Sequence, residues 1–249
     1  MHKFFPLLLL CLVSACTPAT PLPTLTLPAA TQTLTAAPTE LPSATPFPTQ
    51  TSTSTSVPTA TITPTPVYTT LRARVTIDQA VCHYGPGKPY LYKYGVYKDS
   101  NLEVISRDPF GVYLEVQAIG GNNPCWVRAE YMLLKGDLNS LKPVQPEDVI
   151  LPKSPYYGPP GGVSASRKGD QVTVTWQPLV LRAGDDSEQT PYILEAWVCQ
   201  DGNLVFTPLG TFQTTLTIKD ESGCAAPSRA RLLAAEKHGY TRPVVIDWP

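Results

Sequence analysis

The sequence predicts an all-β protein in which two small folded domains follow a tract that cannot build a core. Residues 69–136 alternate short apolar runs with strong turn formers, a pattern typical of short β-strands. Residues 159–249 repeat the pattern with about seven runs, the number typical of immunoglobulin-like sandwiches. Residues 16–68 are rich in Pro and Thr and almost free of charge, so they bury little apolar surface.

The first 15 residues indicate a signal peptide. Lys3 precedes an apolar run at residues 4–13, which is too short to span a bilayer as a helix. The run ends in VSAC at residues 13–16, and this order of apolar, small, small and cysteine resembles the lipobox of bacterial lipoproteins. The resemblance implies that residues 1–15 are removed and that Cys16 carries a lipid, which would anchor the chain to the bacterial cell membrane from the extracytoplasmic side. An ordinary secretory leader with a chance cysteine is the alternative.

The next segment has the composition of a tether. Residues 17–68 hold 17 Thr, 11 Pro and 4 Ser, and Glu40 is their only charged residue. We expect residues 16–68 to be disordered and rich in extended polyproline conformations. At about 3.1 Å per residue these residues extend to about 160 Å, enough to hold folded domains away from a membrane and across a wall layer. The Thr and Ser side chains could also accept O-linked sugars.

The six cysteines divide into three groups. Cys11 leaves with the leader, and Cys16 takes the lipid. The other four fall two in each folded segment: Cys82, Cys125, Cys199 and Cys224. Because an extracytoplasmic compartment permits disulfides, we expect one in each domain, stabilising it by about 3–4 kcal/mol. A four-cysteine zinc site is the competing interpretation, but the sequence has no Cys-x-x-Cys and only three histidines.

The first folded segment suits a small barrel. We expect strands at residues 74–77, 102–105, 112–116 and 125–127. The sequence VCHYGPG at residues 81–87 resembles the vRsGPG segment of bacterial SH3-like (SH3b) domains, and residues 112–116 and 125–132 resemble that family's gWykV and GWvs..yl strands. Tyr113 replaces a usual tryptophan. Cysteines 82 and 125 replace family residues where the first and late strands of that barrel meet, so the resemblance supports a Cys82–Cys125 disulfide.

Aromatic residues of this segment are its candidate ligand-binding residues. Seven of the twelve tyrosines lie between Tyr84 and Tyr131. The resemblance to wall-targeting SH3b domains implies a groove for a peptide or a wall glycan, lined by Tyr84, Tyr90, Tyr92 and Trp126. For each of them, ordinary core or rim packing is the alternative. We interpret His83, a lone histidine beside a turn, as structural.

The second folded segment follows a polar connector, residues 137–158. We expect its strands at residues 163–166, 171–177, 192–199, 204–206, 214–218, 229–235 and 244–248. Residues 159–165, 172–176 and 234–241 resemble the first strand, the second strand with its core tryptophan, and the sixth-strand motif of fibronectin type III domains. Ser228 stands at that family's tyrosine corner. A Cys199–Cys224 disulfide, absent from the typical module, would pin the third strand to the loop before the sixth.

The sequence gives no sign of catalysis. The two histidines outside the leader, His83 and His238, lie in different segments and near no nucleophile motif. No phosphate-binding loop, zinc-protease motif or dinucleotide fingerprint occurs. We therefore expect a protein that is not an enzyme, with no catalytic residue, no metal and no cofactor.

Two tempting motifs and the charge pattern also point away from specialised binding. The acidic run at residues 185–188 lacks the ligand alternation of a calcium loop, and a solvated loop explains it. The tripeptide KGD at residues 168–170 resembles an integrin ligand, but Gly-Asp before a strand is turn chemistry. The formal net charge is −1 with no basic stripe, which argues against nucleic acid as a partner.

Together these observations predict a non-catalytic, lipid-anchored, extracytoplasmic binding protein. The barrel would engage peptidoglycan, a wall glycan or a peptide, and the sandwich would serve as a spacer or a second interaction surface. The alternative is a structural or assembly subunit that docks onto another envelope protein.

Overall fold

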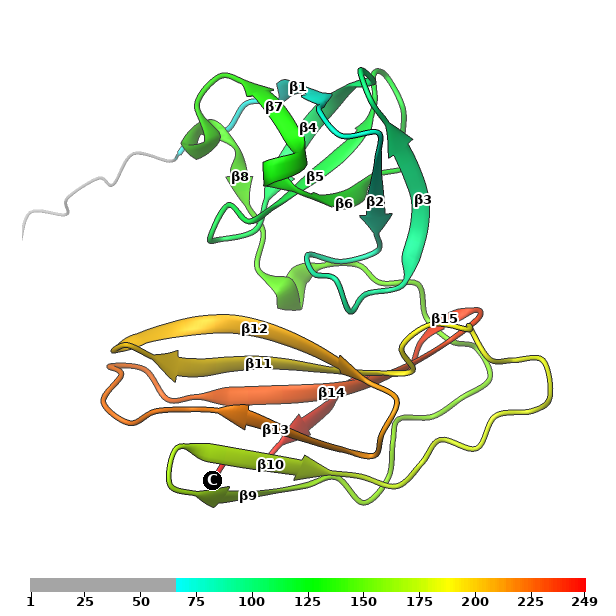
Figure 1. Ribbon diagram of the computed structural model, residues 1–249, viewed down its shortest axis with the longest axis vertical. Helices are drawn as coiled ribbons and strands as arrows, with labels where there is room; N and C mark the ends of the chain where they lie inside the picture. The colour runs from blue at the N-terminus through cyan, green and yellow to red at the C-terminus, as the bar shows by residue number, and fades with distance from the viewer. Residues whose placement is uncertain (1–65) are drawn as a thin grey trace, which may run out of the picture. The chain divides into compact units, whose positions relative to one another are not determined.

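β-strands are the dominant element of residues 66–249, the part of the chain that the computed structural model describes (Figure 1). The helices there are three short 3-10 turns of three residues each. The prediction of an all-β fold is therefore confirmed. None of the described helices is long and apolar enough to cross a membrane. The predicted signal peptide, the lipid site at Cys16 and the tether up to residue 65 lie outside the described residues.

The first domain is a strongly curved sheet of eight strands that forms the SH3-like barrel. The path of neighbouring strands is β3-β2-β6-β5-β4-β1-β7, and β8 pairs in parallel with β4. The strands are β1 (Leu71–Val75), β2 (Gln79–His83), β3 (Tyr92–Tyr97), β4 (Asn101–Arg107), β5 (Tyr113–Ala118), β6 (Cys125–Arg128), β7 (Met132–Lys135) and β8 (Lys142–Pro143).

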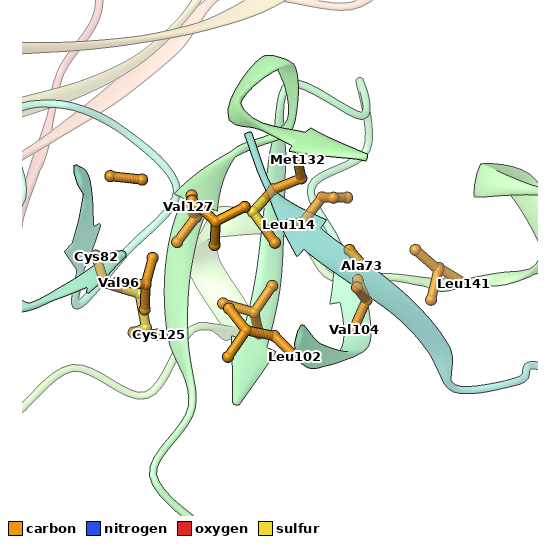
Figure 2. Packing of buried hydrophobic residues seen from close by; sticks show 13 residues of the cluster. Ala73, Cys82, Val96, Leu102, Val104, Leu114, Cys125, Val127, Met132 and Leu141 are labelled. Carbon is orange, nitrogen blue, oxygen red and sulfur yellow. A yellow bond between two sulfur atoms is a disulfide. The ribbon is translucent and has the colours of Figure 1, made fainter. Parts of the chain in front are cut away.

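Alternate residues of these strands fill the barrel core (Figure 2). Strand β5 shows the pattern clearly, because Leu114 and Val116 are buried while Glu115 between them is only partly so. The buried members of the core are Ala73, Val75, Ala80, Cys82, Val96, Leu102, Val104, Leu114, Val116, Cys125, Val127, Met132 and Leu141. The disulfide between Cys82 and Cys125 lies within this core and joins β2 to β6, as predicted.

The barrel's packing continues beyond residue 136, into the segment expected to be a connector. Asp137 caps the 3-10 turn Leu138–Ser140 by accepting a hydrogen bond from the Asn139 amide, 2.9 Å away. This turn directs Leu141 into the core, where it is fully buried. Strand β8 then pairs in parallel with β4. A polar, proline-containing sequence thereby adds an edge strand to the barrel.

The second domain is the predicted immunoglobulin-like sandwich of two antiparallel sheets. One sheet has the order β13-β10-β9, formed by β13 (Thr215–Lys219), β10 (Gln171–Thr175) and β9 (Ser164–Lys168). The other has the order β12-β11-β14-β15, with β16 also paired to β14; its strands are β11 (Tyr192–Gln200), β12 (Asn203–Thr211), β14 (Arg229–Glu236), β15 (Gly239–Tyr240) and β16 (Val244–Ile246). Each of the seven expected strands has its counterpart.

The sandwich core lies between the inner faces of the two sheets. Val172 and Val174 from β10 and Leu194 from β11 are fully buried there. Trp176 meets the ring of Tyr192 edge to face, with centroids 5.3 Å apart. The second predicted disulfide also forms, and it joins Cys199 at the end of β11 to Cys224 in the loop before β14.

Strand β11 is buried on both of its faces, unlike a usual half-exposed sandwich strand. Leu194, Ala196 and Val198 face the sandwich core. The opposite face carries Ile193, which packs with Tyr90 and Leu91 of the loop between β2 and β3. The described residues belong to one compact unit, and this apolar cluster links the barrel loop to the sandwich sheet.

Candidate ligand-binding pocket

The barrel carries a cavity of about 470 Å³, a size in the usual range of small-molecule sites. Tyr84, Lys93, Glu115 and Trp126 line it from the barrel, and residues of the segment 142–150 line it from the other side. It therefore unites strands β3, β5 and β6 with the chain that leaves β8.

The strand register places the aromatic and acidic side chains of this cavity in one row. Trp126 of β6 is the partner of Glu115 in β5 and of His83 in β2. All three belong to the outer face of the barrel, because their neighbours along each strand fill the core. Trp126 is nevertheless only 2% exposed. The segment 142–150, which lines the same cavity, covers an indole that the sheet alone would leave open to solvent.

Charged groups stand at fixed positions around the cavity. The Lys93 ammonium donates a 2.7 Å hydrogen bond to the Pro124 carbonyl and lies 5.2 Å from the centre of the Tyr84 ring. Burial lowers the pKa of Lys93, and the nearby Glu115 carboxylate opposes that shift. Glu115 is held in turn by a 2.6 Å hydrogen bond from the Ser106 hydroxyl. The cavity thus offers an ammonium group, a carboxylate and the Tyr84 ring in preset positions, with the almost fully buried Trp126 indole in its wall.

Two of the four residues predicted to bind a ligand meet in this cavity. Tyr84 and Trp126 both line it. Tyr90 does not, because its side chain is buried and its hydroxyl donates a hydrogen bond to Glu195 in β11. Tyr92 is 46% exposed and lies outside the cavity lining, and its amide donates to the Gln189 side chain over 2.7 Å. Tyr90 therefore has a structural place, whereas Tyr84 and Trp126 remain candidates.

Sequence reasoning missed the charged half of the cavity. Lys93 and Glu115 are ordinary polar residues of β-strands, and nothing in their spacing distinguishes them from a solvated face. Lys142 and Asp148 stand in a segment expected to be a connector. The pairing of β8 with β4 brings that segment to the barrel, and the local sequence pattern does not predict such a tertiary contact.

The loop that presents Tyr84 is fastened at its other end by a buried polar cluster. Glu195 is fully buried and accepts hydrogen bonds from Tyr90 and from the Arg231 guanidinium. Burial raises the pKa of Glu195, and Arg231 offsets part of that shift. Burial, with Glu195 beside it, also raises the pKa of the Tyr90 hydroxyl well above its ordinary value. The Leu91 amide donates to the Tyr240 hydroxyl over 2.6 Å, which fixes the end of the loop.

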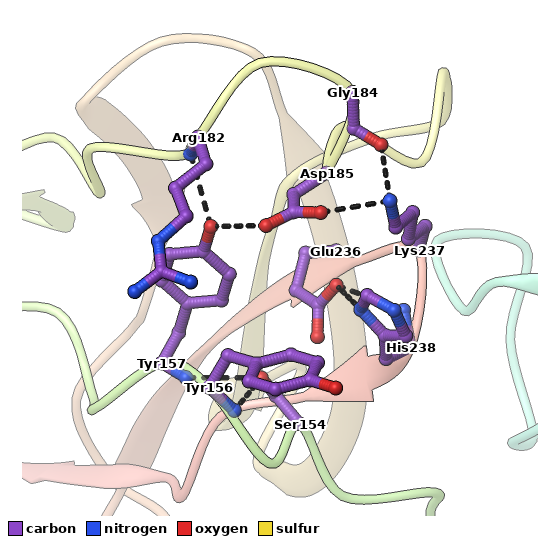
Figure 3. Close-up of polar contacts among 9 residues, drawn as sticks. All are labelled: Ser154, Tyr156, Tyr157, Arg182, Gly184, Asp185, Glu236, Lys237 and His238. Atoms are coloured by element: carbon purple, nitrogen blue, oxygen red, sulfur yellow. Dashed lines mark hydrogen bonds and ion pairs between the residues drawn. The ribbon is translucent and has the colours of Figure 1, made fainter.

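A second polar network lies at one end of the sandwich (Figure 3). The buried Glu236 carboxylate accepts hydrogen bonds from the amide and ring Nδ1 of His238, at 2.8 and 2.7 Å. Asp185 pairs with Lys237 at 2.8 Å and accepts a 2.6 Å hydrogen bond from the Tyr157 hydroxyl. The network joins the segment after residue 153, the loop at residues 182–185 and the β14–β15 hairpin.

This network has the parts of a catalytic triad without its geometry. In a triad the hydroxyl nucleophile bonds to the histidine that the acid orients. Ser154 Oγ instead accepts the amides of Tyr156 and Tyr157, at 3.4 and 3.2 Å, and among the described residues no hydrogen bond joins it to His238. Residues 66–249 also contain no group of three side chains suited to hold a metal ion. The hydrogen bonds and ion pair of the network connect these loops to the β14–β15 hairpin.

Comparisons with known proteins add little. No family model and no curated protein matches the chain. Among solved structures it is similar to titin kinase with its flanking domains (26% identity, TM-score 0.28) and to the twitchin kinase region of C. elegans (26% identity, TM-score 0.26). Each match covers 36% of this chain but only 16% and 15% of those chains, respectively. Likenesses at these TM-scores carry no argument about fold or function.

Proposed function

We propose that this chain is a non-catalytic, lipid-anchored binding protein outside the cytoplasm, whose barrel cavity holds a peptide segment of the cell wall. The observation that carries the proposal is the cavity itself, where Tyr84 and Trp126 stand beside Lys93 and Glu115. Aromatic faces suit apolar side chains or sugar rings, and an ammonium beside a carboxylate suits the alternating donors and acceptors of a peptide.

The compartment has a structural basis of its own. Both disulfides form within their domains, which fits an oxidising, extracytoplasmic environment. The lipid on Cys16 rests on the sequence of residues 1–16. If it is present, intact mass will show the mature chain beginning at Cys16 with the added lipid mass, and a Cys16→Ser variant will leave the membrane fraction.

A titration of the purified protein with soluble muropeptides tests the cavity. We expect saturable binding that weakens at least ten-fold in Lys93→Met, which keeps the aliphatic stem and removes the ammonium. Lys135→Met is the matched control, because Lys135 is exposed on β7 and lines no part of the cavity. Circular dichroism establishes that both variants are folded. Unchanged affinity in Lys93→Met, or no saturable binding by the unmodified protein, would contradict the proposal.

The alternative role, docking onto another envelope protein, has one observation in its favour. Phe110 and Val112, at the turn before β5, are 51% and 46% exposed and form an apolar tip on the barrel. Crosslinking in intact cells distinguishes the two roles. A protein neighbour crosslinked through this turn, together with failure to bind muropeptides, would favour the assembly role.

A further inference from the structure

A second groove of about 280 Å³ opens on the outer face of the barrel. Its polar lining comes from Gln79 and His83 of β2, Lys88 of the β2–β3 loop, Tyr113 of β5, Arg128 of β6 and Tyr131 of the 3-10 turn after β6. None of these residues lines the first cavity. The groove is therefore a separate feature of the barrel, and a ligand bound there does not depend on the function proposed for the first cavity.

The strand register explains why these side chains meet. Arg128 is the partner of Tyr113, and Trp126, two residues earlier on β6, is the partner of His83. Residues two apart on a strand share a face, so Tyr113, Arg128 and His83 all project outward. His83 and Arg128 are diagonal neighbours across β2 and β6, which places them about 7–8 Å apart.

His83 presents a hydrogen-bond acceptor to this groove. Its Nδ1 lies 2.7 Å from the Tyr90 carbonyl oxygen. A carbonyl can only accept, so Nδ1 carries the proton and Nε2 of the neutral ring is left as an acceptor. Burial lowers the pKa of His83, with the bond to Tyr90 opposing the shift, so the ring stays neutral at neutral pH.

The positive charges of the groove come from Arg128 and Lys88. Arg128 pairs with Glu130 through Nε at 2.9 Å, which leaves the outer edge of its guanidinium free to meet a ligand. Lys88 is exposed and lines the groove from the β2–β3 loop. Among the described residues, no acidic side chain lines the groove.

We propose that this groove binds the C-terminal residue of a peptide through its free carboxylate. The carboxylate meets Arg128 and Lys88, and the amide N–H of the same residue donates to His83 Nε2. The spacing is compatible, because the amide N and a carboxylate oxygen of one residue are about 3–3.5 Å apart and a hydrogen bond of about 2.9 Å at each end brings the span to about 9 Å, which the long Arg128 side chain can bridge from a strand position about 7–8 Å from His83. A bare phosphate or sulfate has no N–H for His83, so the mixed donor and acceptor set favours a peptide end over a simple anion.

The test compares two peptides that differ only at the C-terminus. N-acetyl-alanyl-alanine with a free carboxylate and the same peptide as its C-terminal amide are titrated into the full-length protein, and binding is followed by NMR. We expect the acid to bind at least ten-fold more tightly than the amide and to shift the resonances of His83 and Arg128. Arg128→Gln and Lys88→Gln should each weaken the acid at least ten-fold, and Lys93→Met and Lys135→Met should not.

Several results would overturn the proposal. The acid peptide could fail to bind, or the acid and the amide could bind equally well. The NMR shifts could be confined to residues of the first cavity, such as Trp126. N-acetylmuramic acid could bind as tightly as the peptide, which would assign the groove to a glycan. Muropeptides also end in a carboxylate that the groove could bind, so the effect of Lys93→Met on muropeptide binding is measured in the Arg128→Gln background. Failure of the groove is then distinct from failure of the first cavity.

Discussion

Asp220 is a buried polar anchor of the sandwich, and its replacement by asparagine should destabilise the protein by about 3 kcal/mol. The carboxylate is fully buried after β13. It accepts hydrogen bonds from the Cys199 amide (2.8 Å), the Ser228 hydroxyl (2.6 Å), the Trp248 indole (2.8 Å) and the Arg167 guanidinium. One side chain thus joins β9, β11, the loop before β14 and the C-terminal segment.

The magnitude depends on which bonds asparagine can keep. Its oxygen can replace Oδ1 and retain the donors Cys199 and Ser228. Its NH2 group then faces two other donors, Trp248 and Arg167, and both bonds are lost. A hydrogen bond to a charged group contributes about 1.5–3 kcal/mol, but the Arg167 side chain is 31% exposed and water replaces part of its loss. About 3 kcal/mol is therefore expected, a large part of a typical stability of about 5–15 kcal/mol.

Urea unfolding of the purified protein, followed by circular dichroism, measures this loss at pH 7. Asp170→Asn is the control, because Asp170 is exposed and the change should stay within about 0.5 kcal/mol. A loss below about 1 kcal/mol in Asp220→Asn would refute the reasoning, because it would mean that the four hydrogen bonds contribute almost nothing beyond those made with water in the unfolded chain.

The same variant has a pH signature. Burial alone would raise the pKa of Asp220, but the hydrogen bonds from Ser228, Trp248, Cys199 and Arg167 outweigh it and hold the pKa below its ordinary value of 3.8. A carboxyl group with a lower pKa in the folded state stabilises the fold above its unfolded pKa, and this contribution is lost as pH falls through the folded value. The difference between the unmodified protein and Asp220→Asn should therefore shrink as pH falls below about 3.8. A difference independent of pH would show that the charge of Asp220 plays no part.

Three further predictions use the same unfolding measurement. Replacing Cys82 and Cys125 by alanine opens a loop of 43 residues and should lower the free energy of unfolding by about 4 kcal/mol or more; a loss under about 1 kcal/mol would contradict the value placed on this crosslink. Tyr90→Phe removes a donor from the buried Glu195 carboxylate and should cost about 1.5–3 kcal/mol, whereas Tyr97→Phe, at a residue that is 60% exposed, should have almost no effect. Gly239→Ala should cost more than about 1 kcal/mol, because φ is +141° and a Cβ would lie 2.4 Å from the Pro152 carbonyl oxygen. Gly169→Ala should cost less, because Gly169 also has a positive φ, of +59°, but open space around the added Cβ.

Strands with one apolar face were predictable from the sequence, and strands β2 and β3 were not. In β10, Val172 and Val174 alternate with threonines, so the pattern of two is plain. In β2 the buried residues are the small Ala80 and Cys82, while the larger Val81 points outward at 43% exposure. Because the buried residues are small and an exposed residue is large and apolar, the alternation of apolar and polar residues that usually marks a strand is absent here. Only the resemblance to SH3b domains marked this region.

The candidate sites were predictable only in part, because their residues are joined by tertiary pairing. Tyr84 and Trp126 stood out as aromatic residues of a small barrel. Lys93 and Lys142 reach the same cavity through strands β3 and β8, and the position of β8 depends on its pairing with β4. Tyr90 is the opposite case, because the sequence predicted it to bind a ligand. Its hydroxyl is instead hydrogen-bonded to Glu195, which is 105 positions away in the sequence.

The loop at residues 84–91 connects the sandwich to both candidate sites of the barrel. Tyr84 at its start lines the first cavity, and Lys88 in its middle lines the second groove. Near its end, Tyr90 packs beneath Gly85, where a Cβ would come within 2.5 Å of the ring, and bonds to Glu195 of the sandwich. Both proposed binding surfaces therefore include residues of a loop that is anchored to the other domain through Tyr90 and Glu195. Loosening that anchor by Tyr90→Phe should weaken binding at both surfaces together, whereas Lys93→Met and Arg128→Gln should each affect only one.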